Sequence, residues 1–183
     1  HHRSSAASDV YKRQEIKYLS GKRDHAKTLD ELKQEYDEVV ICAGAYTSFL
    51  LPHLNIYPIK GYSISYHHDT EMPTTSILDD DAKIVASPFS NNVFRVAGTA
   101  ELAGWNHDIR MDRIKPLRRW VRKNTFVKDS RPENWACLRP MTPNMMPIVT
   151  KTKGVWVNSG AGHLGWTMGM ALAEKVTNDI FKS

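Results

Sequence analysis

The chain has 183 residues, of which 41% are hydrophobic and 25% are charged, and its formal net charge is +5 at pH 7. This composition is ordinary for a globular protein of one domain or parts of two, and it argues against a disordered or collagen-like chain. No apolar run approaches the roughly 18 residues of a membrane-spanning helix, and the modest net charge does not favour a nucleic-acid partner.

The first segment, HHRSSAASDVYKRQ, differs in texture from the rest. It is small, polar and basic, and it has no apolar period. We therefore expect residues 1–14 to be a non-native or disordered leader outside the fold. No secretory signal is visible, and Cys42 and Cys137 stand in apolar surroundings without metal-ligand spacing. We expect both thiols to be buried and reduced, as in a cytoplasmic protein.

The next elements predict a strand, a helix and a second strand. EIKYL at 15–19 is typical of a short strand, and TLDELKQEY begins with Thr28 as an expected N-cap and Glu31 three residues later. Residues 39–43 then form a continuous apolar run that ends at Gly44. Such a run favours a strand covered on both faces, as in a parallel sheet.

Residues 56–104 change to alternating patterns rich in β-branched and aromatic residues, separated by turn residues. They predict an antiparallel meander of three to six strands. The clearest helix follows at 112–124, with Asp112 as its expected cap and Pro116 in its first turn. Its expected buried face consists of Ile114, Leu117, Trp120 and Val121, and its other side is basic.

A short strand around Trp156, a glycine turn and a final helix from about Gly165 end the chain. Gly160, Gly162 and Gly165 spell G-x-G-x-x-G, but a dinucleotide fingerprint opens a βαβ unit of about 30 residues. The chain stops at Ser183, which leaves room for one helix only. The turn is therefore predicted either to offer helix N–H groups to an anionic group or to form a tight corner.

Arg139 stands in the segment CLRPMTPNMMPIV, which contains no acidic residue. A buried guanidinium without an anion is costly, so either a ligand carboxylate or a distant acidic side chain should pair with it. The histidines have no metal-ligand spacing, and no metal site is predicted.

Five stretches occur in the order in which D-amino-acid dehydrogenases carry them: YDEVVICAGAYTSFL, IYPIKGYSIS, FRVAGTAELAGWN, LRPMTPNMMPIV and GHLGWTMG. From about Tyr36 onward the chain resembles this family of FAD enzymes, within the D-amino-acid oxidase and glycine oxidase superfamily. The resemblance implies an α/β plus α+β fold, in which an antiparallel substrate domain is inserted into a Rossmann-like FAD-binding domain. The chain is similar to the C-terminal half. Residues 15–51 would be strands of the FAD-binding domain, 52–134 the substrate domain, and 135–183 the return to the FAD-binding domain.

The resemblance also implies roles for particular residues. Arg139 matches the arginine that holds the substrate carboxylate, and Tyr62 is expected to contact substrate. No residue is assigned as an acid or base. The residues expected to bind FAD are Gly44, Lys60, Gly61, Gly160, Ala161, Gly162, His163, Leu164 and Gly165, the last six forming a turn against the flavin ring. The turn departs from the family pattern at Ala161 and His163, and Cys137 and Asn144 replace a common glycine and a common aspartate.

The implied activity is oxidative deamination of D-amino acids to 2-oxo acids and ammonia, by hydride transfer to flavin. A quinone-type acceptor would receive the electrons. The basic helix 112–124 could place the protein on the inner face of the membrane, although a solvated cap on the sheet is the preferred interpretation. Because the N-terminal ADP-binding motif of the family is not found in this chain, we expect the chain alone to be inactive. Two alternatives stay open: an oxygen-using glycine or sarcosine oxidase-like enzyme, and a non-catalytic basic module that binds membranes or nucleic acid.

Overall fold

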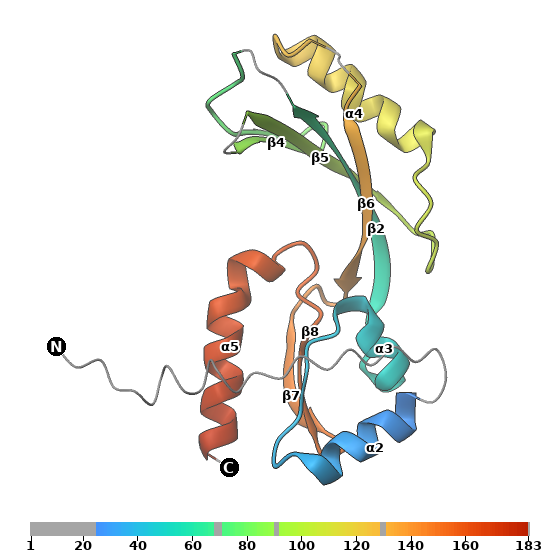
Figure 1. The fold of residues 1–183 in the computed structure, drawn as a ribbon, viewed down its shortest axis with the longest axis vertical. Helices are drawn as coiled ribbons and strands as arrows, with labels where there is room; N and C mark the ends of the chain where they lie inside the picture. The colour runs from blue at the N-terminus through green and yellow to red at the C-terminus, as the bar shows by residue number, and fades with distance from the viewer. Residues whose placement is uncertain (1–24, 68–70, 90–91, 129–130, 183) are drawn as a thin grey trace, which may run out of the picture.

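A computed structural model describes residues 25–67, 71–89, 92–128 and 131–182. The described chain forms two layered parts, each built on its own sheet, and two long strands run from the junction into the upper part (Figure 1). The expected leader at 1–14 and the expected strand at 15–19 lie outside the described residues.

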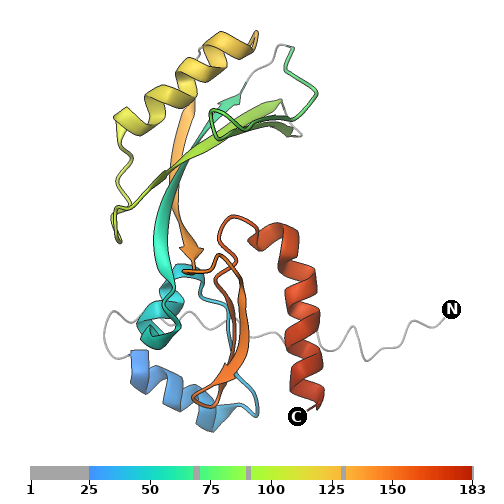
Figure 2. The ribbon, with the colours of Figure 1, turned by 180° about the vertical axis from the view of Figure 1, so that it is seen from behind.

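The lower part is a three-stranded sheet in the order β1-β8-β7. β1 runs parallel to β8, as expected for the apolar run at 39–43, and β7 and β8 form an antiparallel hairpin. Helices α2 and α3 lie on one side of this sheet and α5 on the other (Figures 1 and 2). The elements are α2 (His25–Glu35), β1 (Val40–Ile41), η1 (Gly44–Tyr46), α3 (Thr47–Leu50), η2 (Pro52–Leu54), β7 (Ile148–Thr152), β8 (Val155–Ser159) and α5 (Gly165–Lys182).

The core of the lower part lies between the sheet and helices α2 and α3. Its buried members come from α2, β1 and β8 and from the residue after α3: Leu29, Ile41, Leu51, Val155 and Val157. In this chain α5 is mostly exposed, and Trp166 near its start is 99% exposed. The first turn of α5 therefore borders open space beside the glycine turn.

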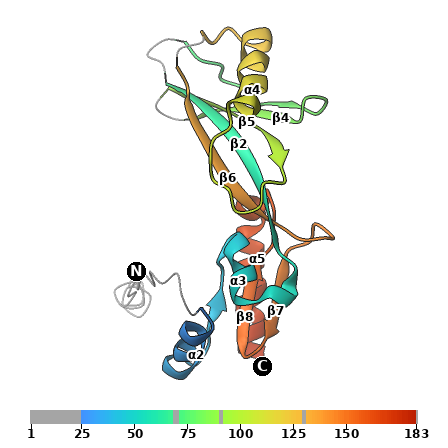
Figure 3. The ribbon, with the colours of Figure 1, turned by 90° about the vertical axis from the view of Figure 1, so that its right-hand side faces the viewer.

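The upper part is a five-stranded antiparallel sheet in the order β3-β4-β5-β2-β6, with α4 packed on one face (Figure 3). Strands β2 and β6 pair along nine positions and extend down to the junction with the lower part (Figures 1 and 3). The elements are β2 (Tyr57–His67), β3 (Ile77–Asp79), β4 (Ile84–Phe89), β5 (Val93–Glu101), α4 (Met111–Asn124) and β6 (Glu133–Met141).

The two faces of the five-stranded sheet differ in what covers them. The α4 face is the larger core, and all four residues predicted for the buried stripe of the helix are buried there: Ile114, Leu117, Trp120 and Val121. Because side chains alternate along a strand, the residues between the core positions emerge on the opposite side. We call that side the open face; it includes Gly61, Ser63, Arg95, Trp135, Cys137 and Arg139.

Three local expectations were wrong. Helix α2 begins at His25, so Thr28 is inside the helix and is not its cap; Ala26 and Lys27, good helix formers, extend it. Helix α4 begins at Met111 after Arg110, and Asp112 lies in its first turn, where its carboxylate pairs with Arg110. Pro116 is inside the helix, beyond the first turn.

The domain boundary and one thiol also differ from expectation. Residues 135–141 belong to β6 of the five-stranded sheet, so the chain returns to the lower part after Met141 and not at 135. Cys42, expected to be buried, is exposed, whereas Cys137 is half-buried, and both are free thiols. Cys42 follows a strand of only two residues, which ends before it can bury the thiol.

Candidate active site

The glycine turn lies at the carboxyl end of β8, beside the carboxyl end of β1. Ser159 Oγ donates to the Gly44 carbonyl oxygen at 3.0 Å, and Thr47 Oγ1 donates to Ser159 Oγ at 3.1 Å. The structure thus brings Gly44 next to the turn that begins at Gly160. In open parallel sheets, this edge is where ligands bind.

The glycine turn packs closely against the end of β6, through one backbone hydrogen bond and through the close approach of two of its glycines. Gly162 N–H donates to the Pro140 carbonyl oxygen at 2.9 Å. A Cβ on Gly162 would lie 2.7 Å from Met141 Sδ, and a Cβ on Gly160 would lie 2.7 Å from Thr142 Cγ2. Both glycines have positive φ angles, of 57° and 78°. The structure therefore explains these two glycines by close packing against Met141, the last residue of β6, and Thr142, which follows it.

Two other glycines at this edge face open space. A Cβ on Gly44 or on Gly165 would have no heavy atom within 4 Å. Gly165 is also the first residue of α5, whose first N–H groups have no partner within the helix and carry its positive dipole end. Open space bordered by Gly44 and the start of α5 fits the anionic, electron-rich edge of a cofactor such as FAD.

Arg139 lies on the open face with its guanidinium across the backbone of β2. The register places Arg139 opposite Ile59 and Cys137 opposite Gly61. A Cβ on Gly61 would overlap the guanidinium of Arg139, so only glycine leaves room for it there. Its Nη1 donates to the Thr99 carbonyl oxygen at 3.1 Å.

The Thr99 carbonyl points toward Arg139 because β5 is irregular at that residue. Thr99 has a φ of +59°, and the pairing of β2 with β5 shifts between Lys60 and Tyr62. A bulge of this kind turns the backbone of one strand, and a positive φ is strained for a β-branched residue. The strain is found where the sheet orients the candidate ligand-binding arginine.

Arg139 has no acidic partner among the described residues, where every ion pair within 4.0 Å involves other groups. Burial lowers the pKa of the guanidinium from its usual value. The neutral Thr99 carbonyl leaves its charge uncompensated. The site therefore favours a carboxylate ligand at Arg139, and Pro140 connects this arginine directly to the glycine turn.

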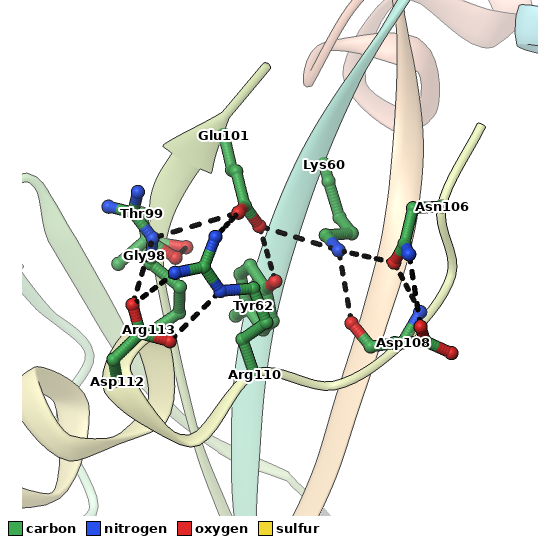
Figure 4. Close-up of polar contacts among 10 residues, drawn as sticks. All are labelled: Lys60, Tyr62, Gly98, Thr99, Glu101, Asn106, Asp108, Arg110, Asp112 and Arg113. Atoms are coloured by element: carbon green, nitrogen blue, oxygen red, sulfur yellow. Dashed lines mark hydrogen bonds and ion pairs between the residues drawn. The ribbon is translucent and has the colours of Figure 1, made fainter. Parts of the chain in front are cut away.

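Lys60 and Tyr62 alternate along β2 with the positions that face Arg139, so they point to the α4 side of the sheet. There they join a buried charged cluster (Figure 4). Tyr62 Oη donates to Glu101 Oε2 at 2.5 Å, and Lys60 Nζ lies 3.4 Å from the same oxygen. Arg110 Nη1 contacts Glu101 Oε1 at 2.8 Å. The hydrogen bond from Tyr62 is the main reason that the pKa of Glu101 is lowered, since it and the nearby cations outweigh burial. Burial opposes the charge of Lys60, but its contacts with Tyr62 and Glu101 prevail and raise its pKa.

The charged cluster also holds the loop 102–110 that follows β5. Lys60 Nζ donates to Asn106 Oδ1 at 3.1 Å and to the Asp108 carbonyl oxygen at 3.0 Å (Figure 4). The same loop contacts the lower part, because Trp105 stacks on Phe49 with ring centroids 4.3 Å apart. The loop therefore joins the two parts close to the candidate site.

The sequence-predicted residues thus fall into two groups. Gly44, Gly61, Arg139 and the turn 160–165 surround the junction of the two sheets, whereas Lys60 and Tyr62 lie behind the sheet. Sequence reasoning missed Glu101, although an acidic residue that ends a strand next to a basic helix was a usable signal. The described residues contain no cluster of three metal-ligating side chains, and none of their helices is long and apolar enough to cross a bilayer.

The fold and the site define a class of protein. A sheet with a parallel strand pair has a ligand-binding edge at the carboxyl ends of those strands, and an antiparallel sheet joined to it presents an arginine to that edge. Residues 5–178 match the family described as FAD dependent oxidoreductase (DAO), and the chain belongs to this family. The resemblance and the fold class inferred from the sequence are thereby confirmed, as is FAD as the cofactor of the family.

Two curated relatives are D-amino acid dehydrogenases. The chain is 46% identical to D-amino acid dehydrogenase 3 of Mesorhizobium japonicum over 160 residues, which cover 79% of the chain and 39% of the relative. It is 33% identical to D-amino acid dehydrogenase of Vibrio atlanticus over 172 residues, which cover 84% of the chain and 40% of the relative. The chain thus spans about two fifths of the length of these relatives.

Solved structures share the fold at low identity. Iminodiacetate oxidase from a Chelativorans species superposes with a TM-score of 0.70 at 20% identity, covering 81% of this chain and 43% of that one. Glycine oxidase from Bacillus cereus gives a TM-score of 0.62 at 18% identity, covering 76% and 41%.

Proposed function

We propose that the protein containing this chain is a D-amino-acid dehydrogenase, which converts D-amino acids to 2-oxo acids and ammonia. The observation that carries the proposal is the guanidinium of Arg139, which lies over Gly61 without an acidic partner among the described residues and is adjacent to the glycine turn. The identity of 46% to a D-amino acid dehydrogenase supports the same reaction.

In this proposal, bound FAD supplies the two-electron acceptor for the hydride of the substrate α-carbon. The role of the chain is positional: Arg139 binds the α-carboxylate bidentately, and Thr99 and Gly61 fix the plane of the guanidinium. The start of α5 and the backbone at Gly44 border the cofactor, and the positive end of the helix stabilises added negative charge. Water then hydrolyses the imino acid product.

The experiment is anaerobic mixing of the flavin-loaded protein with D-alanine or L-alanine, followed by absorbance of the flavin. Reduction by the D-isomer alone supports the proposal, and no reduction by any D-amino acid would contradict it. Reoxidation with a water-soluble quinone or with oxygen then separates the dehydrogenase from the oxygen-using glycine or sarcosine oxidase-like alternative. We propose the quinone as acceptor.

We further propose a peripheral position on the inner face of the cell membrane, where a quinone would be reached. Helix α4 carries six basic residues and one acidic residue, and it lies on the outer side of the five-stranded sheet (Figure 3). Binding to anionic vesicles but not to neutral ones, weakened by Arg119→Gln, would support this position. If the protein binds neither anionic nor neutral vesicles, the result would favour α4 as a solvated cap on the sheet of a cytoplasmic protein.

A further inference from the structure

The open face of the five-stranded sheet carries a second arginine, Arg95, in addition to Arg139. Arg95 pairs with Ser65 of β2, and Arg139 pairs with Ile59 of the same strand. Positions 59 and 65 are an even number of residues apart, so both arginines emerge on the same face. The register alone therefore places two cations on the surface that presents Arg139.

Their side chains converge along β2. The guanidinium of Arg139 lies over Gly61, and Arg95 Nε donates to Ser63 Oγ at 3.2 Å. Positions 61 and 63 are neighbours on one face of the strand and about 7 Å apart along it, so the two guanidinium groups contact adjacent positions of that face. Cys137, which pairs with Gly61, lies close enough to both arginines for their charges to affect its thiol. Burial raises the pKa of the thiol, and Arg139 and Arg95 partly offset the rise.

Arg95 is held in a defined orientation. Its Cζ lies 4.8 Å from the centroid of the Trp135 ring, and Nε donates to Ser63 Oγ. Among the described residues its two Nη groups make no hydrogen bond, so they can donate to another acceptor. In the described part of the chain no carboxylate lies within 4.0 Å of Arg95. Two like charges without counter-ions on a partly buried face are unfavourable unless a ligand supplies two anionic groups.

We propose that this face takes a D-amino acid whose side chain ends in a carboxylate, such as D-glutamate or D-aspartate. Arg139 binds the α-carboxylate and Arg95 the side-chain carboxylate. This inference rests on the proposed function and names its substrate class.

Two geometric facts support this assignment. The strand positions that the two arginines contact, Gly61 and Ser63, are about 7 Å apart along β2, which is comparable with the span of a short dicarboxylic amino acid between two guanidinium groups. Arg139 also lies nearer the glycine turn, because its neighbour Pro140 accepts the Gly162 N–H, and Ser63 with Arg95 lies farther along β2 from that contact. A substrate bound this way has its α-carbon at the junction and its side chain directed away from it.

The test compares acids with their amides in the complete flavin-loaded protein. Values of kcat/KM are measured for D-glutamate against D-glutamine and for D-aspartate against D-asparagine, pairs that differ in charge and hardly in shape. We expect the acids to be preferred. Arg95→Gln should lower the acid-to-amide ratio about 10- to 150-fold, the range for a hydrogen bond to a charged group.

Two further variants separate charge from packing. Arg95→Met keeps an unbranched stem against Trp135 and removes the cation, so it should lower the ratio as Arg95→Gln does even if the latter folds poorly. Arg119→Gln removes the same charge from α4, on the other side of the sheet, and should leave the ratio unchanged.

The outcomes are distinct for the two proposals. If D-amino acids reduce the flavin but the acid-to-amide ratio is the same in the wild type, Arg95→Gln and Arg95→Met, Arg95 only packs on Trp135 and the inference is wrong. If no D-amino acid reduces the flavin, the proposed function itself is wrong. A ratio that falls equally in Arg119→Gln would show a general field effect and would also overturn the role of Arg95.

Discussion

Gly61→Ala should damage substrate binding although the new methyl group need not touch a ligand. The added Cβ would overlap the guanidinium of Arg139, which lies across the strand at this position. Either the arginine moves or the strands β2 and β6 separate. The strands are paired along nine positions, so we expect the arginine side chain to move.

The magnitude follows from what Arg139 then loses. Ordinary contact requires a displacement of about 1 Å or more, and a misplacement of that size can cost about 100-fold in rate. The displacement also breaks the bond from Nη1 to the Thr99 carbonyl, which is 3.1 Å long and fixes the plane of the guanidinium. We therefore expect kcat/KM for D-amino acids to fall about 10- to 150-fold, the range for charge-assisted hydrogen bonds.

The assay is steady-state turnover with D-alanine in the flavin-loaded protein, together with flavin content and melting temperature. Gly169→Ala is a matched control, because a Cβ there meets no heavy atom within 4 Å. In an Arg139→Lys background, Gly61→Ala should have little further effect on kcat/KM, since both changes remove the same interaction. Wild-type kcat/KM in Gly61→Ala, or full additivity with Arg139→Lys, would refute the reasoning.

Three other changes test separate parts of the structure. Arg139→Lys replaces a bidentate donor with a point charge and should lower kcat/KM about 10- to 150-fold while flavin content, measured by absorbance, stays intact. Gly162→Val should lower the melting temperature, because its side chain meets Met141; a normal melting temperature would contradict the packing. The pKa of Glu101 is lowered in the folded state, so its contribution to stability is present above its ordinary pKa of 4.5 and is lost as the pH falls through the lowered value. Urea unfolding as a function of pH should therefore show an acid limb that Glu101→Gln flattens.

The sequence was most informative where one periodicity determined the structure. The four apolar residues of α4 follow the helical period, and the structure buries all of them against the sheet. The apolar run at 39–43 predicted a parallel strand, and β1 pairs in parallel with β8. These predictions needed only the spacing of apolar residues, because burial of one face was the dominant energy.

The sequence was least informative where the chain violates local rules. β6 is a strand of nine residues that contains Arg139 and Pro140, and two more prolines follow it within six residues. Because prolines are typical of turns, the sequence did not predict a strand there. Lys60 and Gly61 were expected to bind FAD and Tyr62 to contact substrate. Neighbours on a strand face opposite sides, so of these three only Gly61 shares a face with Arg139. The bulge at Thr99 depends on the pairing of distant strands, which no local pattern specifies.

The loop 102–110 has a consequence for how the molecule unfolds. The loop leaves the five-stranded sheet after β5 and stacks Trp105 on Phe49 of α3. It then continues into α4, which packs on the five-stranded sheet. His107 adds a hydrogen bond of 3.0 Å to Tyr46 Oη, again across the junction. Opening either part alone must break these contacts as well as its own core. Amide hydrogens in β2 and in β8 should therefore exchange through one shared opening event, and the two sheets should behave as a single cooperative unit.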